Sequence, residues 1–121
     1  MTDQYLLSAK KGIDWALARL NPDGSFQGSE VTVNGHYKAP QTLATGGYIR
    51  EAEQVAAYIG DYFFSGGDFH CGPEETAPPI ATNYKNAWLC WGMHTLGAYD
   101  LSSPGGDFLE RAQHPLSLIH I

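Results

Sequence analysis

The chain has 121 residues, of which 43% are hydrophobic and 17% charged, a composition typical of one globular domain or part of one. Its formal net charge of −6, with no cluster of lysine and arginine, makes nucleic acids and anionic membranes poor candidates as partners. No apolar run reaches the length of a membrane span, and the first residues lack the pattern of a secretory signal. We therefore expect a cytoplasmic protein with no nucleic-acid partner, no membrane span and reduced cysteines.

The first half of the chain predicts three helices. Apolar residues recur at spacings of three and four over residues 3–20, as on one face of an amphipathic helix, and Pro22 prevents that helix from continuing. A short helix is expected over residues 37–45, where Pro40 fits the first turn. Residues 49–63 give the clearest pattern, an apolar stripe opposite charged residues.

The second half predicts a turn, a loop and two more helices. A glycine turn at residues 65–67 precedes a polar, proline-containing loop over residues 70–82. Asn83 is expected to cap a strongly apolar helix that Gly97 ends. Ser103-Pro104 is expected to open a further helix, because serine at the cap and proline in the first turn favour a helix start. The sequence thus predicts an all-α protein.

Two features recur along the chain. Phe26 and Phe69 each follow a turn and a small polar residue, 43 residues apart, and Tyr37-Lys38 and Tyr84-Lys85 each open a helix, 47 residues apart. A period in this range, built from paired helices, indicates stacked αα-hairpins in which one unit cannot bury its apolar face alone. Residues from Pro104 onward are interpreted as the start of a third unit, so that the chain holds about two and a half hairpins.

The last residues have a different interpretation. Residues 116–121, Leu-Ser-Leu-Ile-His-Ile, match the translation of CTG-TCT-CTT-ATA-CAC-ATC, which resembles the end of a sequencing-library adapter. We therefore expect an adapter-derived tail there, and leave it out of the fold. The alternative is an ordinary apolar helical segment. Residues 1–115 are accordingly expected to be an N-terminal or internal fragment of a longer, metagenomic open reading frame.

The turn at residues 21–26, Asn-Pro-Asp-Gly-Ser-Phe, resembles the Gln-x-x-Asp-Gly-x-Trp repeat motif of terpenoid cyclases and protein prenyltransferase β-subunits. Phe26 stands where the motif has tryptophan, Asn21 stands where it has glutamine, and the second copy at residues 65–69 keeps only the glycine and the aromatic residue. The resemblance implies αα-hairpins that form part of an (α/α)6 toroid, truncated here after about two and a half hairpins. Its inner helices would be residues 37–45 and 83–96, and its outer helices residues 3–20 and 49–63.

Candidate functional residues follow from this arrangement, because the loops leading into the inner helices of a toroid face one end of its cavity. The candidate catalytic residues are Tyr84, Tyr37, His70 and Asp68, since a carboxylate paired with tyrosine or histidine suffices for proton abstraction or glycosidic acid/base catalysis. The candidate substrate-binding residues are Trp88, Trp91, Lys38 and Lys85. The alternative is structural: the aromatic residues pack, and the two lysines are solvated cations at helix ends.

Metal and cofactor chemistry finds little support in the sequence. The chain lacks both the Asp-x-Asp-Asp run of terpenoid cyclases and the zinc-ligand set of the prenyltransferases. Asp68, His70 and Cys71 stand too close together for a tetrahedral zinc site, so no metal is expected, and the identity of any cofactor stays open.

Two classes of function remain. The first is an enzyme that acts on an apolar or carbohydrate substrate in the central cavity of a toroid. The second is a non-catalytic helical repeat scaffold that binds a ligand or a protein on the same concave surface. In either case the fragment alone is expected to be inactive, because an incomplete ring leaves inner faces exposed.

Overall fold

The computed structural model describes residues 3–28, 33–70 and 79–112. These residues form the helices α1 (Asp3–Leu17), η1 (Val33–Gly35, one 3-10 turn), α2 (Ala39–Thr45), α3 (Ile49–Tyr62), α4 (Pro79–Thr95) and α5 (Tyr99–Ala112), and the strands β1 (Phe64–Ser65) and β2 (Asp68–Phe69). The prediction of a mostly helical protein is confirmed, and a short two-stranded sheet is added to it. Over the described ranges, no helix has both the length and the apolar character needed to cross a membrane. The expected tail at residues 116–121 lies outside the described residues.

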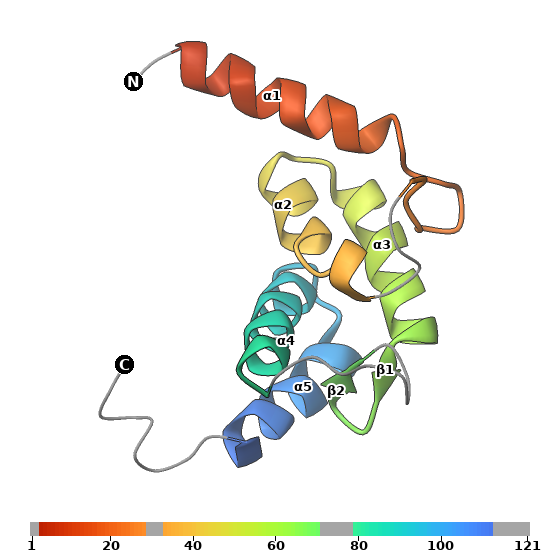
Figure 1. Ribbon diagram of the computed structural model, residues 1–121, viewed down its shortest axis with the longest axis vertical. Coiled ribbons are helices and arrows are strands. Elements are labelled where there is room, and N and C mark those ends of the chain that lie inside the picture. Colours follow the sequence, from red (N-terminus) through yellow and green to blue (C-terminus); the bar gives the residue numbers. More distant parts are fainter. Residues whose placement is uncertain (1–2, 29–32, 71–78, 113–121) are drawn as a thin grey trace.

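The helices form a curved array around α2 and α4 (Figure 1). These two helices pack against each other, α3 packs against α2, and α5 packs against α4. Helix α1 crosses one end of the array and contributes no fully buried side chain. The hollow side of the array is therefore bounded by α1, α2 and α4.

The core lies between α2, α3, α4 and the β1–β2 hairpin. The apolar stripe predicted for residues 49–63 is confirmed, because Ala52, Val55, Ala56 and Ile59 of α3 are all buried. From the other elements, the fully buried apolar side chains are Val33, Leu43, Phe69, Leu89 and Met93. Burying one large apolar side chain stabilises the folded state by about 1.5–3 kcal/mol, so the stability of the described core depends on these elements far more than on α1.

The short sheet is a hairpin that the sequence predicted only as a turn. Phe64 pairs with Phe69 and Ser65 with Asp68, and the two loop glycines have φ angles of +60° and +91°. Two successive positive φ angles define the type I′ turn that matches the twist of paired strands, and Gly66 and Gly67 adopt them without steric cost. An earlier turn is closed by an isolated β-bridge between Leu20 and Phe26, and Gly24, with a φ angle of +95°, lies within it.

Helices α2 and α4 end in turns of the same type. The amide of Tyr48 donates to the carbonyl of Leu43 at 2.9 Å, and the amide of Ala98 donates to that of Met93 at 2.8 Å. Gly47 and Gly97 precede these amides with φ angles of +90° and +76°, which completes a Schellman motif in both places. Each turn leads directly into the next helix, so α3 and α5 begin at corresponding points of the chain, 50 residues apart.

Two predicted helix starts are wrong. Helix α4 begins at Pro79 rather than after Asn83, because proline is favoured in the first turn of a helix, where its missing N–H is not needed. Helix α5 begins at Tyr99 rather than at Ser103-Pro104, because the glycine turn after α4 already sets the helical direction, and Pro104 lies inside the helix. Of the loop predicted over residues 70–82, residues 71–78 lie outside the described part of the chain.

Candidate functional site

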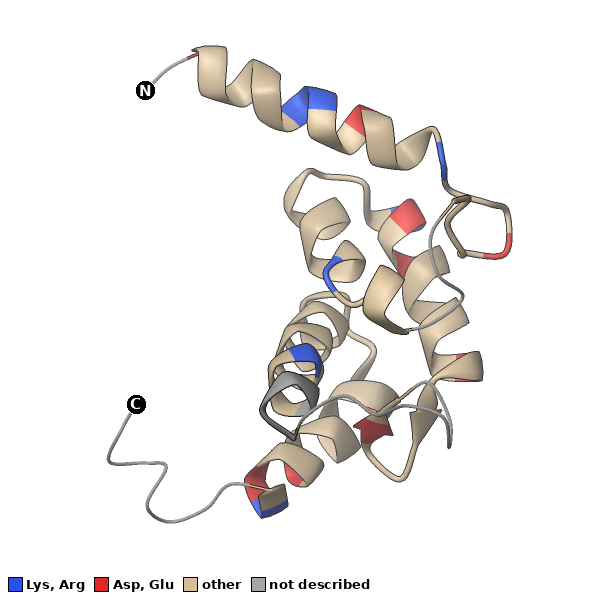
Figure 2. Ribbon diagram, viewed as in Figure 1, with Lys and Arg blue, Asp and Glu red and all other residues tan. Residues whose placement is uncertain are grey.

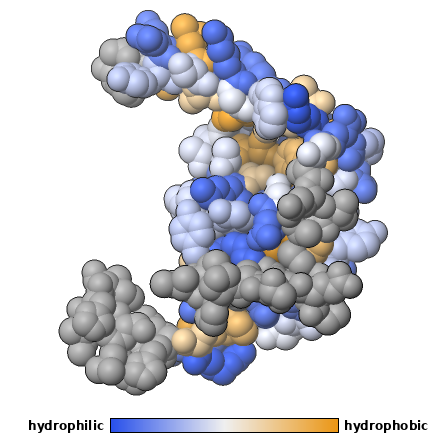
Figure 3. Space-filling view, in the orientation of Figure 1, coloured by the Kyte–Doolittle hydropathy of each residue, from blue (hydrophilic) through white to orange (hydrophobic). Residues whose placement is uncertain are grey.

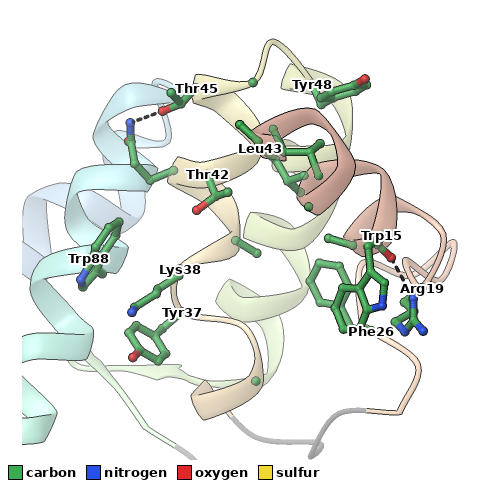
Figure 4. Close-up of a pocket in the computed structure, with 18 of the residues that line it drawn as sticks. Trp15, Arg19, Phe26, Tyr37, Lys38, Thr42, Leu43, Thr45, Tyr48 and Trp88 are labelled. Carbon is green, nitrogen blue, oxygen red and sulfur yellow. Dashed lines mark hydrogen bonds between the residues drawn. The ribbon is translucent and has the colours of Figure 1, made fainter. Parts of the chain in front are cut away.

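A groove of about 1300 Å³ opens on the hollow side of the array, between α1 and the pair α2 and α4 (Figure 4). In the space-filling view an apolar hollow lies directly beneath α1 (Figure 3). Six aromatic side chains line the groove: Trp15, Phe26, Tyr37, Tyr48, Trp88 and Trp91. The chain has three tryptophans, and all three line this groove.

Lys38 forms the centre of an aromatic cluster at one end of the groove. Its Nζ lies 5.6 Å from the ring centre of Tyr37, 5.8 Å from that of Tyr84 and 5.5 Å from that of Trp88. The two tyrosine rings meet edge to face, 5.9 Å between centres. A cation within about 6 Å of an aromatic face is attracted by the ring quadrupole, so the three rings hold the ammonium in place. We call these four side chains the Lys38 cluster.

The Lys38 cluster shifts the proton affinities of two of its members. Its hydrogen bond with Tyr84 raises the pKa of Lys38, with a further contribution from the neighbouring Tyr37. The pKa of Tyr84 is lowered, first by a hydrogen bond from Trp88 and then by one from Lys38. Both donors favour the phenolate, so Tyr84 loses its proton more readily than an ordinary tyrosine, although it stands beside the groove and is not one of the described residues that line it.

Two more predicted residues, Trp88 and Trp91, lie together on the groove side of α4. Their ring centres are 5.3 Å apart, and Trp91 is 55% exposed. Side-chain hydrogen bonds fix the nearby helix ends: Thr95 Oγ1 donates to Gln41 Oε1 at 2.7 Å, and Gln41 Nε2 donates to Thr45 Oγ1 at 3.0 Å. The tryptophans therefore project from a rigid junction between α2 and α4.

Asp68 and His70 do not join the Lys38 cluster. Asn86 Nδ2 donates to Asp68 Oδ1 at 2.9 Å, and Asn86 Oδ1 accepts the amide of Phe69 at 3.1 Å. Asn86 lies about 200° around α4 from Tyr84, so the carboxylate is held on the opposite face of that helix. His70 stands at the end of the hairpin, where its amide donates to the carbonyl of Phe63 at 2.7 Å. The structure thus separates the four candidate catalytic residues into two pairs.

Lys85 also lies outside the groove. It is only 4% exposed, and its Nζ donates to Asn34 Oδ1 at 3.0 Å. The alternative interpretation of Lys85 as a solvated helix-end cation is therefore wrong, while Lys38, which is exposed, fits it. Asn34 itself lines the groove, so the Lys85 ammonium stands directly behind the groove wall.

The far end of the groove holds a pair that the sequence analysis missed. Arg19 lies with its guanidinium carbon 3.8 Å from the ring centre of Trp15, and its Nη1 donates to the Trp15 carbonyl at 3.1 Å (Figure 4). The spacing of four residues on a helix places such side chains on one face and could have revealed the pair. The family resemblance places residues 3–20 among the outer helices, where a side chain would not reach the cavity, so the sequence did not point to this pair.

Metal binding finds no support in the described residues. Nowhere in residues 3–28, 33–70 and 79–112 do three His, Cys, Asp or Glu side chains come together as metal ligands. Cys71, one of the residues weighed as a ligand, lies outside these ranges, and burial raises the pKa of the half-buried Cys90 thiol. His36 is buried among Phe26, Tyr58 and Phe63, with ring centres 5.3–5.8 Å away, which is a core position.

Comparisons of the chain with protein-family models, with curated proteins and with solved structures found no match.

Proposed function

We propose that the chain forms consecutive units of an α/α helical repeat, of the toroid type that its turn motif resembles, and that the hollow face of this repeat binds a ligand. Recurring contacts support the repeat. A side-chain carbon added at Gly24 would collide with Gln54 and Tyr58 of α3, and one added at Gly67 would collide with Pro104 and Phe108 of α5, partners that lie 50 residues apart. In both places a turn glycine lets the hairpin touch the next outer helix.

The ligand that the groove fits best has a flat ring or an apolar body. The observation that carries this proposal is the gathering of all three tryptophans with the Lys38 cluster in one groove of about 1300 Å³. Aromatic faces pack against sugar rings and hydrocarbon alike, and hydroxyl and amide groups such as those of Thr42 and Gln41 can orient a polar ligand. In this proposal Tyr84 transfers the proton if the ligand is also a substrate.

The indole N–H resonances of the tryptophans provide a direct test, because every tryptophan reports on the groove. We expect saturable shifts of the Trp88 and Trp91 signals with cellotetraose or with 2-naphthamide, a sugar chain and a neutral aromatic probe. Trp88→Ala is expected to weaken binding by about tenfold, the equivalent of about 1.4 kcal/mol. Tyr62→Ala removes an aromatic residue that is 69% exposed on α3 and is the matched control. Unchanged indole spectra with both probes would refute a ligand-binding groove.

A second candidate function is the binding of a protein helix along α1. When α1 is aligned with α3 by their turn glycines, a shift of 43 residues, five of the seven α1 residues that line the groove correspond to buried positions of α3. These residues are Ala9, Gly12, Ile13, Trp15 and Ala16, and their counterparts are Ala52, Val55, Ala56, Tyr58 and Ile59. On α3 that face is covered largely by α2. A helix with the character of α2 would therefore fit the same face of α1.

A peptide with the sequence of residues 36–48, which include α2, tests this second function. Binding along α1 is expected to shift the backbone amide resonances of Ala9 and Ile13, and Leu6→Asp, a change at a groove-lining residue that is 66% exposed, is expected to abolish the shifts. Lys11→Asp alters the same helix outside the groove lining and is the control. Equal binding by both variants would refute the helix site.

A further inference from the structure

The described residues that line the groove carry a net charge opposite in sign to that of the chain as a whole. Its formal net charge is −6, with 13 acidic and 7 basic residues. Three of the seven basic residues line the groove, namely Lys10, Arg19 and Lys38, whereas none of the described lining residues is acidic. Random placement on an acidic surface would bring more carboxylates than cations to a groove of this size.

The separation follows the layers of the fold (Figure 2). Helices α2 and α4 contain no aspartate or glutamate, while α1, α3 and α5 together carry eight: Asp3, Asp14, Glu51, Glu53, Asp61, Asp100, Asp107 and Glu110. The hollow face formed by α2 and α4 is therefore positive with respect to the rest of the described surface.

Two of the three basic residues of the groove are also held in position. Lys38 lies among three aromatic rings at 5.5–5.8 Å, and Arg19 lies on the Trp15 ring at 3.8 Å. A long side chain that is already ordered loses less conformational entropy when it binds a ligand. Ordered cations beside apolar ring faces are suited to a molecule that has both an anionic group and a ring or hydrocarbon body.

We propose that the ligand of the groove is a carboxylate or similar anion on an apolar or ring-shaped body, with Lys38 as the residue that binds the anionic group and the neighbouring tryptophans as the surface for the body. This inference rests on the proposed ligand-binding function and adds the charge of the ligand to it. Arg19 lies beside Trp15 on the other side of the groove from Lys38 and adds a second positive charge to the lining (Figure 4).

Two probes that differ only in charge test this inference. 2-Naphthoate and 2-naphthamide have the same ring system, and the dissociation constant of each is measured from the tryptophan indole shifts at 20 mM and at 300 mM salt. We expect 2-naphthoate to bind about three- to tenfold more tightly at low salt, and this preference to shrink at high salt, because salt screens exposed charges. The preference is expected to disappear in Lys38→Gln and to persist in Lys38→Arg.

Lys11→Gln is the matched control, because it changes the net charge by the same amount at an exposed residue of α1 outside the groove lining. Its preference for 2-naphthoate is expected to equal that of the wild type. Equal affinities for the two probes would overturn the anionic ligand, and a preference that survives in Lys38→Gln would overturn Lys38 as the residue that binds the anionic group; either result leaves the groove as a binding site. If neither probe binds, the anionic ligand and the ligand-binding function fail together.

Discussion

Asn86→Ala is expected to destabilise the fold by about 2–4 kcal/mol, although this residue lies outside the groove. Asn86 is fully buried on α4, where it accepts the amide of Phe69 at 3.1 Å and donates to Asp68 Oδ1 at 2.9 Å. Alanine removes the hydrogen bond to Phe69, worth about 1 kcal/mol net, and leaves the buried Phe69 N–H without its acceptor at a further cost of about 1–3 kcal/mol. Asp68 is only partly buried, so a hydrogen bond with water replaces the one that it loses, and this loss adds little to the free-energy cost.

Urea unfolding at pH 7, followed by far-ultraviolet circular dichroism, measures this cost. Asn83→Ala changes a half-buried asparagine three residues earlier on the same helix, and is expected to alter the free energy of unfolding by less than about 0.5 kcal/mol. Asp68→Asn keeps an oxygen that can accept from Asn86 and is expected to cost less than Asn86→Ala. If Asn86→Ala and Asn83→Ala have the same stability, the hairpin is not anchored through Asn86, and the argument that removes Asp68 from the catalytic set also fails.

Three further predictions concern turns and proton affinities. Gly67→Ala is expected to lower the free energy of unfolding in urea by at least about 2 kcal/mol, because its φ is +91° and the new methyl group would collide with α5. Gly66→Ala is the comparison: its φ is +60°, the added methyl group would meet open space, and the expected cost is only about 1 kcal/mol. Hydrogen bonds from the Ser25 hydroxyl and amide lower the pKa of Asp23 below 3.8, so the stability that this carboxylate contributes is present above that pH and is lost as the pH falls through the folded-state pKa. Ser25→Ala is therefore expected to destabilise the protein more at pH 7 than at a pH low enough to protonate Asp23, while the loss of the hydrogen bond from Asn21 Nδ2 to Ser25 Oγ is felt at both; an equal effect at both pH values would contradict the assignment. In a spectrophotometric titration at 295 nm, Tyr84→Phe is expected to remove the tyrosine that ionises at a lower pH than an ordinary tyrosine, and an unchanged first phase would contradict the shift.

The parts of the fold that the sequence predicts well are those set by local periodicity. Helix α3 is found to within a residue, because its apolar stripe spans four turns and a glycine turn precedes it. The start of α4 is missed because the helix begins at the second of two consecutive prolines, a pattern that also fits a loop. The β1–β2 hairpin is missed because strands of two residues have no periodicity, although two consecutive glycines were available as a signal for a tight hairpin turn.

The candidate site shows the same division between local and tertiary information. Trp88 and Trp91 are three residues apart on one helix, so their proximity follows from helical geometry. The sequence groups Asp68 and His70 with Tyr84 and Tyr37 only because they precede a predicted helix, and no pattern in the sequence states which way a hairpin side chain points. That direction is decided by Asn86, a tertiary partner that lies 18 residues from Asp68.

The two Tyr-Lys pairs show why similar sequence does not guarantee an equivalent position. Tyr84 follows Tyr37 by 47 residues, but the turns that end α2 and α4 are 50 residues apart, so the pairs differ by about one helical turn in their place along the two helices. Because α4 extends further toward its N-terminus than α2, Tyr84 reaches Tyr37 across the groove instead of occupying its counterpart position. The shift also gives the two lysines opposite environments: Lys38 is exposed among aromatic rings, whereas Lys85 is buried against Asn34. The Lys38 cluster therefore depends on the difference between the two units, and a strictly regular repeat with the same residues would not assemble it.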